Sequence, residues 1–244
     1  MGTYIKTFDQ HTEYETYINS ENAVLPNMSY CRDNNHAYFN QKPDPYNGHE
    51  YVDLGLPSGT MWAKCNVGAE TETDWGDYFQ WADPEPATNR PCDSANYKWY
   101  GTTSDADENN ITKYNSIDSK QKLEPCDDMA HVNMGGEWYM ADSAEWEELT
   151  ANTTNELVSN YKNSGVDGRL YRGKNMYSGS TLFFPKSGWR QNNNTNRNSI
   201  RIYNPSMSSM YGSNSANHVN ITGNYIGQAY PKTYAIPVRG VVKL

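Results

Sequence analysis

The chain has 244 residues, a net charge of −9 and a mean hydropathy of −0.92. This length suffices for one large domain with a small appendage, and its 20 Tyr and 7 Trp residues exclude a disordered chain. No run of eighteen apolar residues is present, which excludes a transmembrane helix, and the first residues lack the pattern of a signal peptide.

The charge is distributed unevenly along the chain. All 29 acidic residues lie at or before Asp167, whereas ten of the 20 basic residues follow it. A basic region of this kind is able to attract an anionic glycan or a nucleic acid. Because the basic residues are dispersed, unlike a dense nucleic-acid footprint, we expect a solvated face balanced by the acidic part of the same fold.

Residues 1–46 are predicted to form a small N-terminal module, followed by a larger domain over residues 47–244. Residues 11–20 carry Tyr14, Tyr17 and Ile18 at helical spacing, which predicts a short amphipathic helix. The segments AVL and HAYF that follow are candidate strands. The sequence KPDPYNG, rich in turn-forming residues, then marks the boundary.

The larger domain begins with short strands punctuated by Gly and Pro, in EYVDLGLPSGTMWAKCNVGA and DWGDYFQWADPEP. Their large apolar residues are interpreted as structural: Tyr51, Val52, Leu54, Trp62, Trp75, Tyr78, Phe79 and Trp81. Residues 84–127 contain few apolar positions and many polar ones. They are predicted to be a long excursion over the surface.

One clear helix is predicted over residues 142–151. Asp142 is able to cap its start, Glu145 is the reciprocal partner, and Trp146 with Leu149 faces inward. Beyond it, RLYR, STLFFP, SIRIY and TYAIPVRGVVKL are predicted strands separated by polar loops. The last is apolar and β-branched, so we expect it to be central in its sheet.

Four cysteines, Cys31, Cys65, Cys92 and Cys126, form no CxxC pair, so neither a zinc site nor a redox motif is indicated. Buried thiols are expected, and a Cys92–Cys126 bridge remains open. A run of oxygen-bearing residues offers ligands for Ca²⁺ but lacks the spacing and glycine of an EF-hand, which favours a solvated loop. The run is Asp105, Asp107, Glu108, Asn109 and Asn110. We predict no bound metal and no cofactor.

The sequence offers little for an enzyme. It has no HExxH, no GxSxG and no glycine-rich phosphate loop before a helix, and its five histidines are scattered. His131, inside AHVNMGG, is interpreted as a structural hydrogen-bonding residue rather than a base. The protein is therefore predicted not to be an enzyme.

The stretch from Gly188 to Ile226 is rich in Asn, Ser and Tyr and contains no Asp, Glu or Lys. These residue types bind through hydrogen bonds and flat aromatic contacts, as in antibody paratopes. Asn also suits turns, and Asn tracts occur without a binding role. Because this tract lies between strand-like segments and is interleaved with Tyr203, Tyr211 and Tyr225, we favour a recognition surface.

Four segments carry a family resemblance: EYVDLGLPSGTMWAKCNVGAETETDWGDYFQWAD, AHVNMGGEWYMADSAEWEEL, LFFPKSGWR and YAIPVRGVVKL. In this order they resemble the C-type-lectin-fold variable proteins of diversity-generating retroelements, a large family in Bacteroidetes. This family is related to the formylglycine-generating-enzyme fold and to the phage major tropism determinant. The resemblance spans about residues 49–244, and residues 7–31 also resemble a module of gut-phage proteins.

The resemblance implies an α+β, C-type lectin-like fold of the formylglycine-generating-enzyme subclass, loop-rich with short strands and few helices. It also implies a reverse transcriptase that makes errors at adenines, which converts Asn codons to Ser, Tyr, Arg and others but not to Met or Gln. Residues 192–225 have the composition that this leaves, and Met207, Met210 and Gln228 are interpreted as fixed scaffold positions. The sequence departs from the family pattern at Tyr139–Ala141, where Arg and Pro are common, and at Asn204 and Pro205, where an aromatic-Ser-Ser run is frequent.

The resemblance predicts a protein that attaches a phage tail to a bacterial cell-surface protein or glycan, without nucleic-acid binding or membrane insertion. Residues 1–46 are then a candidate contact with other virion proteins. A bacterial surface adhesin of the same fold is one alternative. An enzyme of the sulfatase-modifying type is another, opposed by the absence of cysteine after Cys126. The predicted exposed face comprises Asn192, Asn194, Asn196, Asn198, Arg201, Tyr203, Asn204, Ser206, Tyr211, Asn217, Asn220 and Tyr225.

Overall fold

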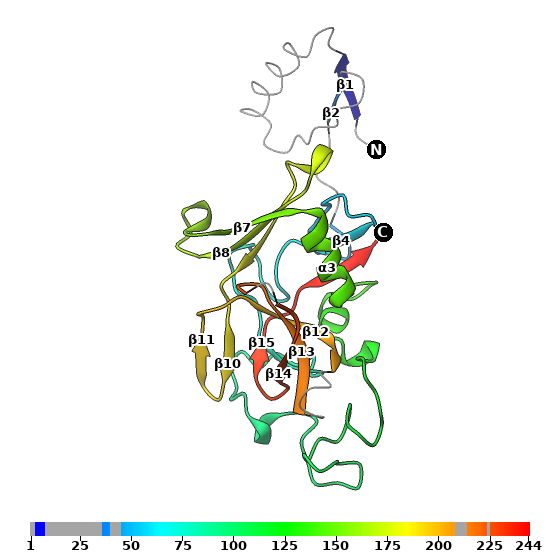
Figure 1. Ribbon diagram of the computed structural model, residues 1–244, viewed down its shortest axis with the longest axis vertical. Helices are drawn as coiled ribbons and strands as arrows, with labels where there is room; N and C mark the ends of the chain where they lie inside the picture. Colours follow the sequence, from blue (N-terminus) through cyan, green and yellow to red (C-terminus); the bar gives the residue numbers. More distant parts are fainter. Residues whose placement is uncertain (1–2, 8–35, 40–44, 208–213, 224) are drawn as a thin grey trace.

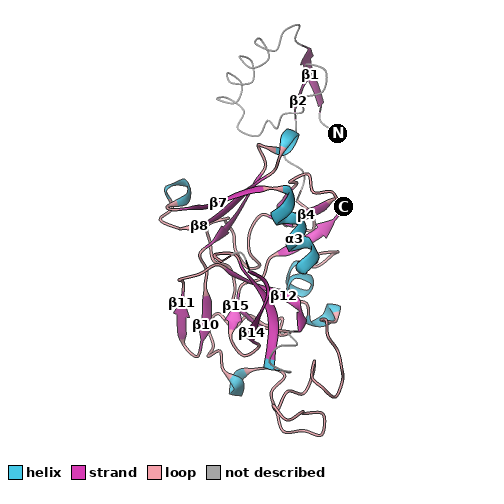
Figure 2. Cartoon of the chain, viewed as in Figure 1, coloured by secondary structure: helices cyan, strands magenta, loops and turns pink. Residues whose placement is uncertain are grey.

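A computed structural model of the chain describes residues 3–7, 36–39, 45–207, 214–223 and 225–244. Short β-strands dominate these ranges, and their two α-helices are α2 (Met129–Met134) and α3 (Ser143–Asn152) (Figure 2). The prediction of a loop-rich chain with short strands and few helices is confirmed. Among the described residues, no helix has the length and apolar character of a membrane span.

Near the N-terminus, β1 (Thr3–Thr7) pairs with β2 (His36–Phe39) in an antiparallel two-stranded sheet, separate from the other four sheets. The strand predicted for HAYF is therefore confirmed. The helix predicted over residues 11–20 and the AVL strand lie outside the described residues.

A four-stranded sheet with the order β3-β4-β16-β6 contains the C-terminal strand. In that order the strands are Tyr51–Val52, Thr60–Ala63, Gly240–Lys243 and Tyr139–Met140. The strand β16 lies between β4 and β6, which confirms the predicted central position. The segment TYAIPVRGVVKL nevertheless forms two strands. The break contains Pro237, which has no backbone N–H to donate to a sheet.

A second four-stranded sheet, β11-β10-β15-β5, carries the other half of that segment. Its strands, in that order, are Asn194–Asn196, Trp189–Gln191, Ala235–Ile236 and Phe79–Gln80. Beside it lies the three-stranded antiparallel sheet β12-β13-β14. Its strands are Arg201–Met207, Ser215–Asn220 and Tyr225–Pro231. These two sheets occupy the half of the molecule opposite β7 and β8 (Figure 1).

The second three-stranded sheet is the antiparallel sheet β7-β8-β9, with strands Thr154–Val158, Gly168–Arg172 and Thr181–Pro185. The strands predicted for RLYR and STLFFP are β8 and β9, and both are mostly buried. The strand β7 was not predicted, because its sequence TNELV is polar. Its side chains are exposed or half-buried, so it shows no apolar pattern.

The predicted helix is confirmed in α3, including its cap. Asp142 accepts from the backbone of Ala144 and Glu145, and the Glu145 carboxylate accepts from the backbone N–H of Asp142. Trp146 and Leu149 are fully buried. The Trp146 ring lies 4.6 Å from that of Trp62, in an edge-on contact that joins the helix to β4. The shorter helix α2, capped by Asp128, was not predicted because its six residues show little periodicity.

The excursion over residues 84–127 contains only bridges, turns and the 3₁₀ helices η1 (Ser94–Asn96) and η2 (Pro125–Asp127). Further short 3₁₀ helices are η3 (Tyr161–Asn163) and η4 (Asn175–Tyr177). Buried rings hold the excursion in place: the Tyr97 hydroxyl donates to the Trp81 carbonyl at 2.9 Å, and the Tyr114 ring lies edge-on to the Trp81 ring.

Arg239 is a buried connection between the sheets. Its guanidinium donates to the carbonyls of Ala63, Lys64 and Phe183 and to the Asn66 amide oxygen, at 2.8–3.0 Å. The side chain is fully buried. Because all these partners are neutral acceptors, the charge is satisfied by backbone dipoles, which fixes β4 and β9 to the C-terminal segment.

Candidate functional site

The Asn-rich tract begins in the hairpin formed by β10 and β11, which lie side by side in Figure 1. Trp189 pairs with Asn196, and Gln191 pairs with Asn194. Because side chains alternate between the two faces of a strand, these four side chains share one face of the hairpin. One indole and three amides are thereby presented together.

The opposite face of the hairpin is anchored to the excursion. Arg190 is buried and donates to the carbonyls of Ala87 and Thr88. At the tip, Asn192 and Cys92 exchange two backbone hydrogen bonds of 2.9 Å each. Asn192 has a φ of +49°, in the left-handed region that Asn tolerates better than most residues. The hairpin is therefore fixed both in its middle and at its tip.

Two further contacts fix the base of the hairpin. Gly188 has a φ of +68°, and a Cβ added there would lie 1.7 Å from the Asn196 carbonyl oxygen. Only glycine permits this close approach of the backbones. After β11, the Arg197 guanidinium lies 3.5 Å from the centroid of the Trp75 ring. Trp75 was interpreted as structural, yet 38% of its surface is exposed, and its ring packs against the Arg197 guanidinium.

An open cavity of about 440 Å³ lies along this hairpin face. Its volume is within the range of about 300–1,000 Å³ that is typical of small-ligand sites. The lining residues are Trp189, Gln191, Asn194, Thr195, Asn196, Arg197 and Asn198. Three of the predicted binding residues therefore meet at one cavity, together with an indole, a guanidinium and a further amide.

A group of aromatic rings connects this cavity to the sheet β12-β13-β14. The Trp189 ring stacks on that of Tyr234 at 5.4 Å, and Tyr230 lies edge-on to both. The Arg201 guanidinium lies 4.7 Å from the centroid of Tyr230. The rings of Trp189, Tyr230 and Tyr234 are half-buried. They provide a rigid support for the cavity wall, because packed rings have few ways to rearrange.

His218 locks the strands of the neighbouring sheet together. Its Nδ1 donates to the Gln228 carbonyl at 2.7 Å, and its Nε2 accepts from Arg201 at 2.6 Å. The bond from Arg201 requires the neutral ring, because a protonated Nε2 cannot accept. Burial and, next, the Arg201 charge lower the pKa of His218 to about 3, although the bond to Gln228 opposes this shift.

The structure divides the predicted face into three groups. Asn192, Asn194, Asn196 and Asn198 lie on or just after the hairpin, and all but the half-buried Asn196 are exposed. At one end of the neighbouring sheet, Arg201 pairs with Asn220, which pairs with Tyr225. At its other end lie the half-buried Ser206 and Asn217. Tyr211 and Met210 lie outside the described residues.

Two predicted members of the exposed face are wrong. Tyr203 and Asn204 have no exposed surface. The Tyr203 hydroxyl lies 3.0 Å from the Pro231 carbonyl and 2.8 Å from that of Tyr234. The Asn204 amide donates to the Ser143 hydroxyl at 3.0 Å. These residues are held inside because β12 lies between β13 and the Pro237 segment, whose carbonyl accepts from the Tyr203 N–H.

Several residues of the site were not predicted, namely Trp189, Gln191, Arg197, Tyr230 and Tyr234. The prediction selected residue types that error-prone copying can produce from Asn codons. Trp and Gln are not among these types, so Trp189 and Gln191 were not selected. The alternation of Trp189 and Gln191 on one strand face was visible in the sequence WRQNNNTN. The contacts of Tyr230 and Tyr234 with Trp189 are long-range and had no local signal.

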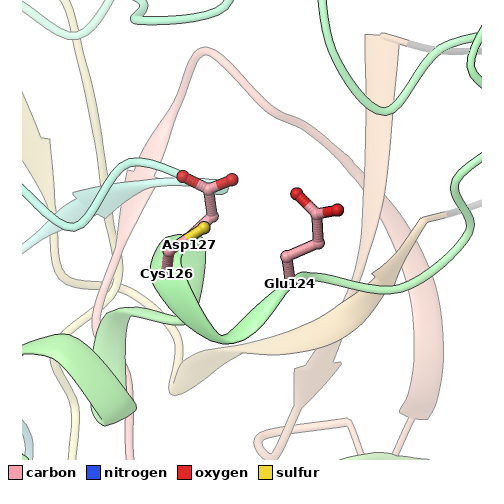
Figure 3. A group of neighbouring side chains, drawn as sticks. All are labelled: Glu124, Cys126 and Asp127. Atoms are coloured by element: carbon pink, nitrogen blue, oxygen red, sulfur yellow. The ribbon is translucent and has the colours of Figure 1, made fainter.

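A second group of polar side chains, Glu124, Cys126 and Asp127, lies near η2 (Figure 3). Lysines neutralise both carboxylates: Lys113 contacts both, and Lys98 donates to Asp127 at 3.1 Å. Burial opposes ionisation of Asp127, but the hydrogen bonds from its neighbours lower its pKa overall. The arrangement is an ion-pair network rather than a site that attracts a metal.

Other predicted positions have local structural roles. Asp107, in the run considered for Ca²⁺, accepts from the backbone N–H groups of Asn109 and Ile111 and so closes its own loop. His131 shares a hydrogen bond with the Trp138 carbonyl at 3.0 Å, which agrees with a structural role. Each residue satisfies backbone groups near its own position.

The cysteines differ from the expectation of buried thiols. Cys92 is buried, Cys65 is half-buried and Cys126 is exposed, and all three are free. The bridge between Cys92 and Cys126 is therefore not formed. Cys31 lies outside the described residues.

Comparison of the chain with protein-family models, with curated proteins and with solved structures found no match. The assignment of function therefore depends on the geometry of the hairpin face and on the sequence.

Proposed function

We propose that this is a ligand-recognition protein with a C-type lectin-like fold that attaches a phage to a bacterial cell surface. The observation that carries the proposal is the hairpin face, where Trp189, Gln191, Asn194 and Asn196 surround an open cavity on a firmly held backbone. Amides offer both donors and acceptors, and an indole adds contact area at low entropic cost.

The rigidity of the hairpin supports this proposal. Binding loses free energy when a loop must be ordered, so a loop that is already fixed binds more tightly. Here Arg190 is buried against two carbonyls, and the backbone of Asn192 is bonded to that of Cys92. A single site of this size binds weakly, and repetition of the protein on a virion compensates through avidity.

Diversification by a retroelement is the second part of the proposal. Of the Asn residues in β11 and the loops around it, Asn192, Asn193, Asn194 and Asn198 are exposed, so substitutions there do not disturb the core. The buried Tyr203 and Asn204 are assigned to the scaffold instead. The coding DNA tests this: we expect an adjacent near-copy of the C-terminal region that differs only where the copy has adenine. Absence of such a copy would contradict diversification.

Binding of the labelled full-length protein to a panel of intact Bacteroidetes strains, measured by flow cytometry, tests attachment. We expect the double variant Asn194→Ala/Asn196→Ala to bind a positive strain at least about tenfold more weakly, which corresponds to about 1.4 kcal/mol. The matched control is Thr154→Ala, an exposed position on β7 in a different sheet. The proposal fails if no strain is bound or if the double variant binds like the control.

A further inference from the structure

Arg197 is the charged member of the cavity lining, and its guanidinium is held in a defined orientation. It stacks on Trp75 at 3.5 Å and lies near Tyr78, whose hydroxyl donates to the Ser187 carbonyl at 2.6 Å. The stacking uses the flat face of the guanidinium, and its N–H donors lie at the edge. These donors form a planar fork, which is the geometry that recognises carboxylate, sulfate and phosphate groups.

Across the described part of the chain, no carboxylate forms an ion pair with Arg197, although its side chain is exposed. Of the described residues that line the cavity, none is acidic, so Arg197 is the one charged side chain among them. The cavity is therefore a positive environment that attracts anions.

The rest of the cavity wall suits a ligand rich in hydroxyl groups. The amides of Gln191, Asn194 and Asn196 can donate and accept together, as hydroxyl groups require. Trp189, backed by Tyr234, provides an apolar surface against which the C–H face of a sugar ring packs. The centre of an interface with a protein is usually more apolar, whereas amides surround the one indole here.

We propose that the hairpin cavity binds an acidic saccharide, with its anionic group on Arg197 and its hydroxyl groups on the three amides. The inference rests on the proposed recognition function and specifies its ligand class. Trp189 stacks against the sugar ring. In this proposal, recognition proceeds through hydrogen bonds, stacking and charge.

The test is the affinity of the full-length protein for paired saccharides, measured by calorimetry in 50 and 300 mM salt. The pairs are oligogalacturonate and its methyl ester, dextran sulfate and dextran, and a phosphorylated oligomannose with its neutral parent. We expect at least one acidic member to bind about tenfold more tightly than its neutral partner, with the difference reduced at high salt. The carboxylated, sulfated and phosphorylated arms identify the anionic group.

Two variants separate charge from geometry. Arg197→Gln is expected to remove the preference for the acidic member, and Arg197→Lys to restore only part of it, because lysine lacks the planar fork. Trp189→Ala should weaken the acidic and the neutral member alike. Circular dichroism and the unfolding temperature verify that each variant is folded.

Equal affinity for the acidic and neutral members, or binding to none of the acidic saccharides, overturns this inference. If the protein still binds intact cells through Asn194 and Asn196, then the recognition function stands and only the ligand class is wrong. If cell binding also fails, then both proposals fall.

Discussion

The hairpin β10–β11 and the strand β12 come from the same Asn-rich tract, yet they place their polar side chains in opposite environments. On the hairpin, Asn194 is exposed beside a cavity, whereas Asn204 on β12 is fully buried and bonded to Ser143. Both side chains are Asn, so the difference comes from their neighbours. The strand β11 is an edge strand, and β12 is covered on its second side by the Pro237 segment.

The largest expected effect on stability comes from comparing a buried tyrosine, Tyr203, with an exposed one, Tyr225. Replacement of the buried Tyr203 by Ala leaves a cavity and unpaired carbonyls, and is expected to lower the free energy of unfolding by about 3–5 kcal/mol. Tyr225→Ala, at a side chain that is 58% exposed, is expected to change it by less than about 0.5 kcal/mol. Urea unfolding of both variants gives the two values. Similar losses in the two would show that the contrast is wrong.

Replacement of Gly188, at the base of the hairpin, is expected to have an effect of intermediate size on stability. Gly188→Ala places a methyl group against the Asn196 carbonyl, in a backbone conformation that alanine disfavours. We expect a loss of about 1–3 kcal/mol in stability and loss of cell binding. Gly59→Ala is the control, because Gly59 also has a positive φ but open space around its Cα. Retention of cell binding by Gly188→Ala would mean that the hairpin shape is unimportant.

The buried His218 makes the stability of the sheet β12-β13-β14 sensitive to acid. The pKa of His218 is lowered to about 3 in the folded protein, mainly by burial. Between pH 6.5 and 3, the unfolded chain therefore binds one more proton than the folded chain at this residue. The contribution of His218 to the free energy of unfolding is complete above pH 6.5 and decreases as the pH falls towards 3.

The expected contribution is at most about 1.4 kcal/mol per pH unit. It is measured as the difference in slope between the wild type and His218→Gln in urea unfolding at pH 7, 6, 5 and 4. The variant should have the flatter dependence, because glutamine does not titrate. Identical slopes would show that His218 is not the acid-sensitive contact of this sheet.

Local signals in the sequence predicted the elements that depend on neighbouring residues. The cap formed by Asp142 and Glu145 specified α3, and the apolar runs RLYR and STLFFP specified β8 and β9. The polar strand β7 and the six-residue helix α2 had no comparable signal. Their structure is determined by pairing with β8 and by the bond from the Met140 N–H to the Asp128 carboxylate.

The candidate site was predicted in part. The Asn residues of the hairpin were identified from composition, and three of them line the cavity. The burial of Tyr203 and the contact of Arg197 with Trp75 depend on segments more than thirty residues away in the sequence. Contacts of this range leave no periodic pattern in a single sequence, so composition alone could not separate the exposed positions from the buried ones.

The tip of the hairpin is joined to the excursion through main-chain atoms alone, by the paired bonds between Asn192 and Cys92. Because these bonds join main-chain atoms, they do not depend on the side chains at the positions next to Asn192. New side chains at the neighbouring positions can therefore be tried without remaking the frame, and the same cavity outline would serve many different surface chemistries.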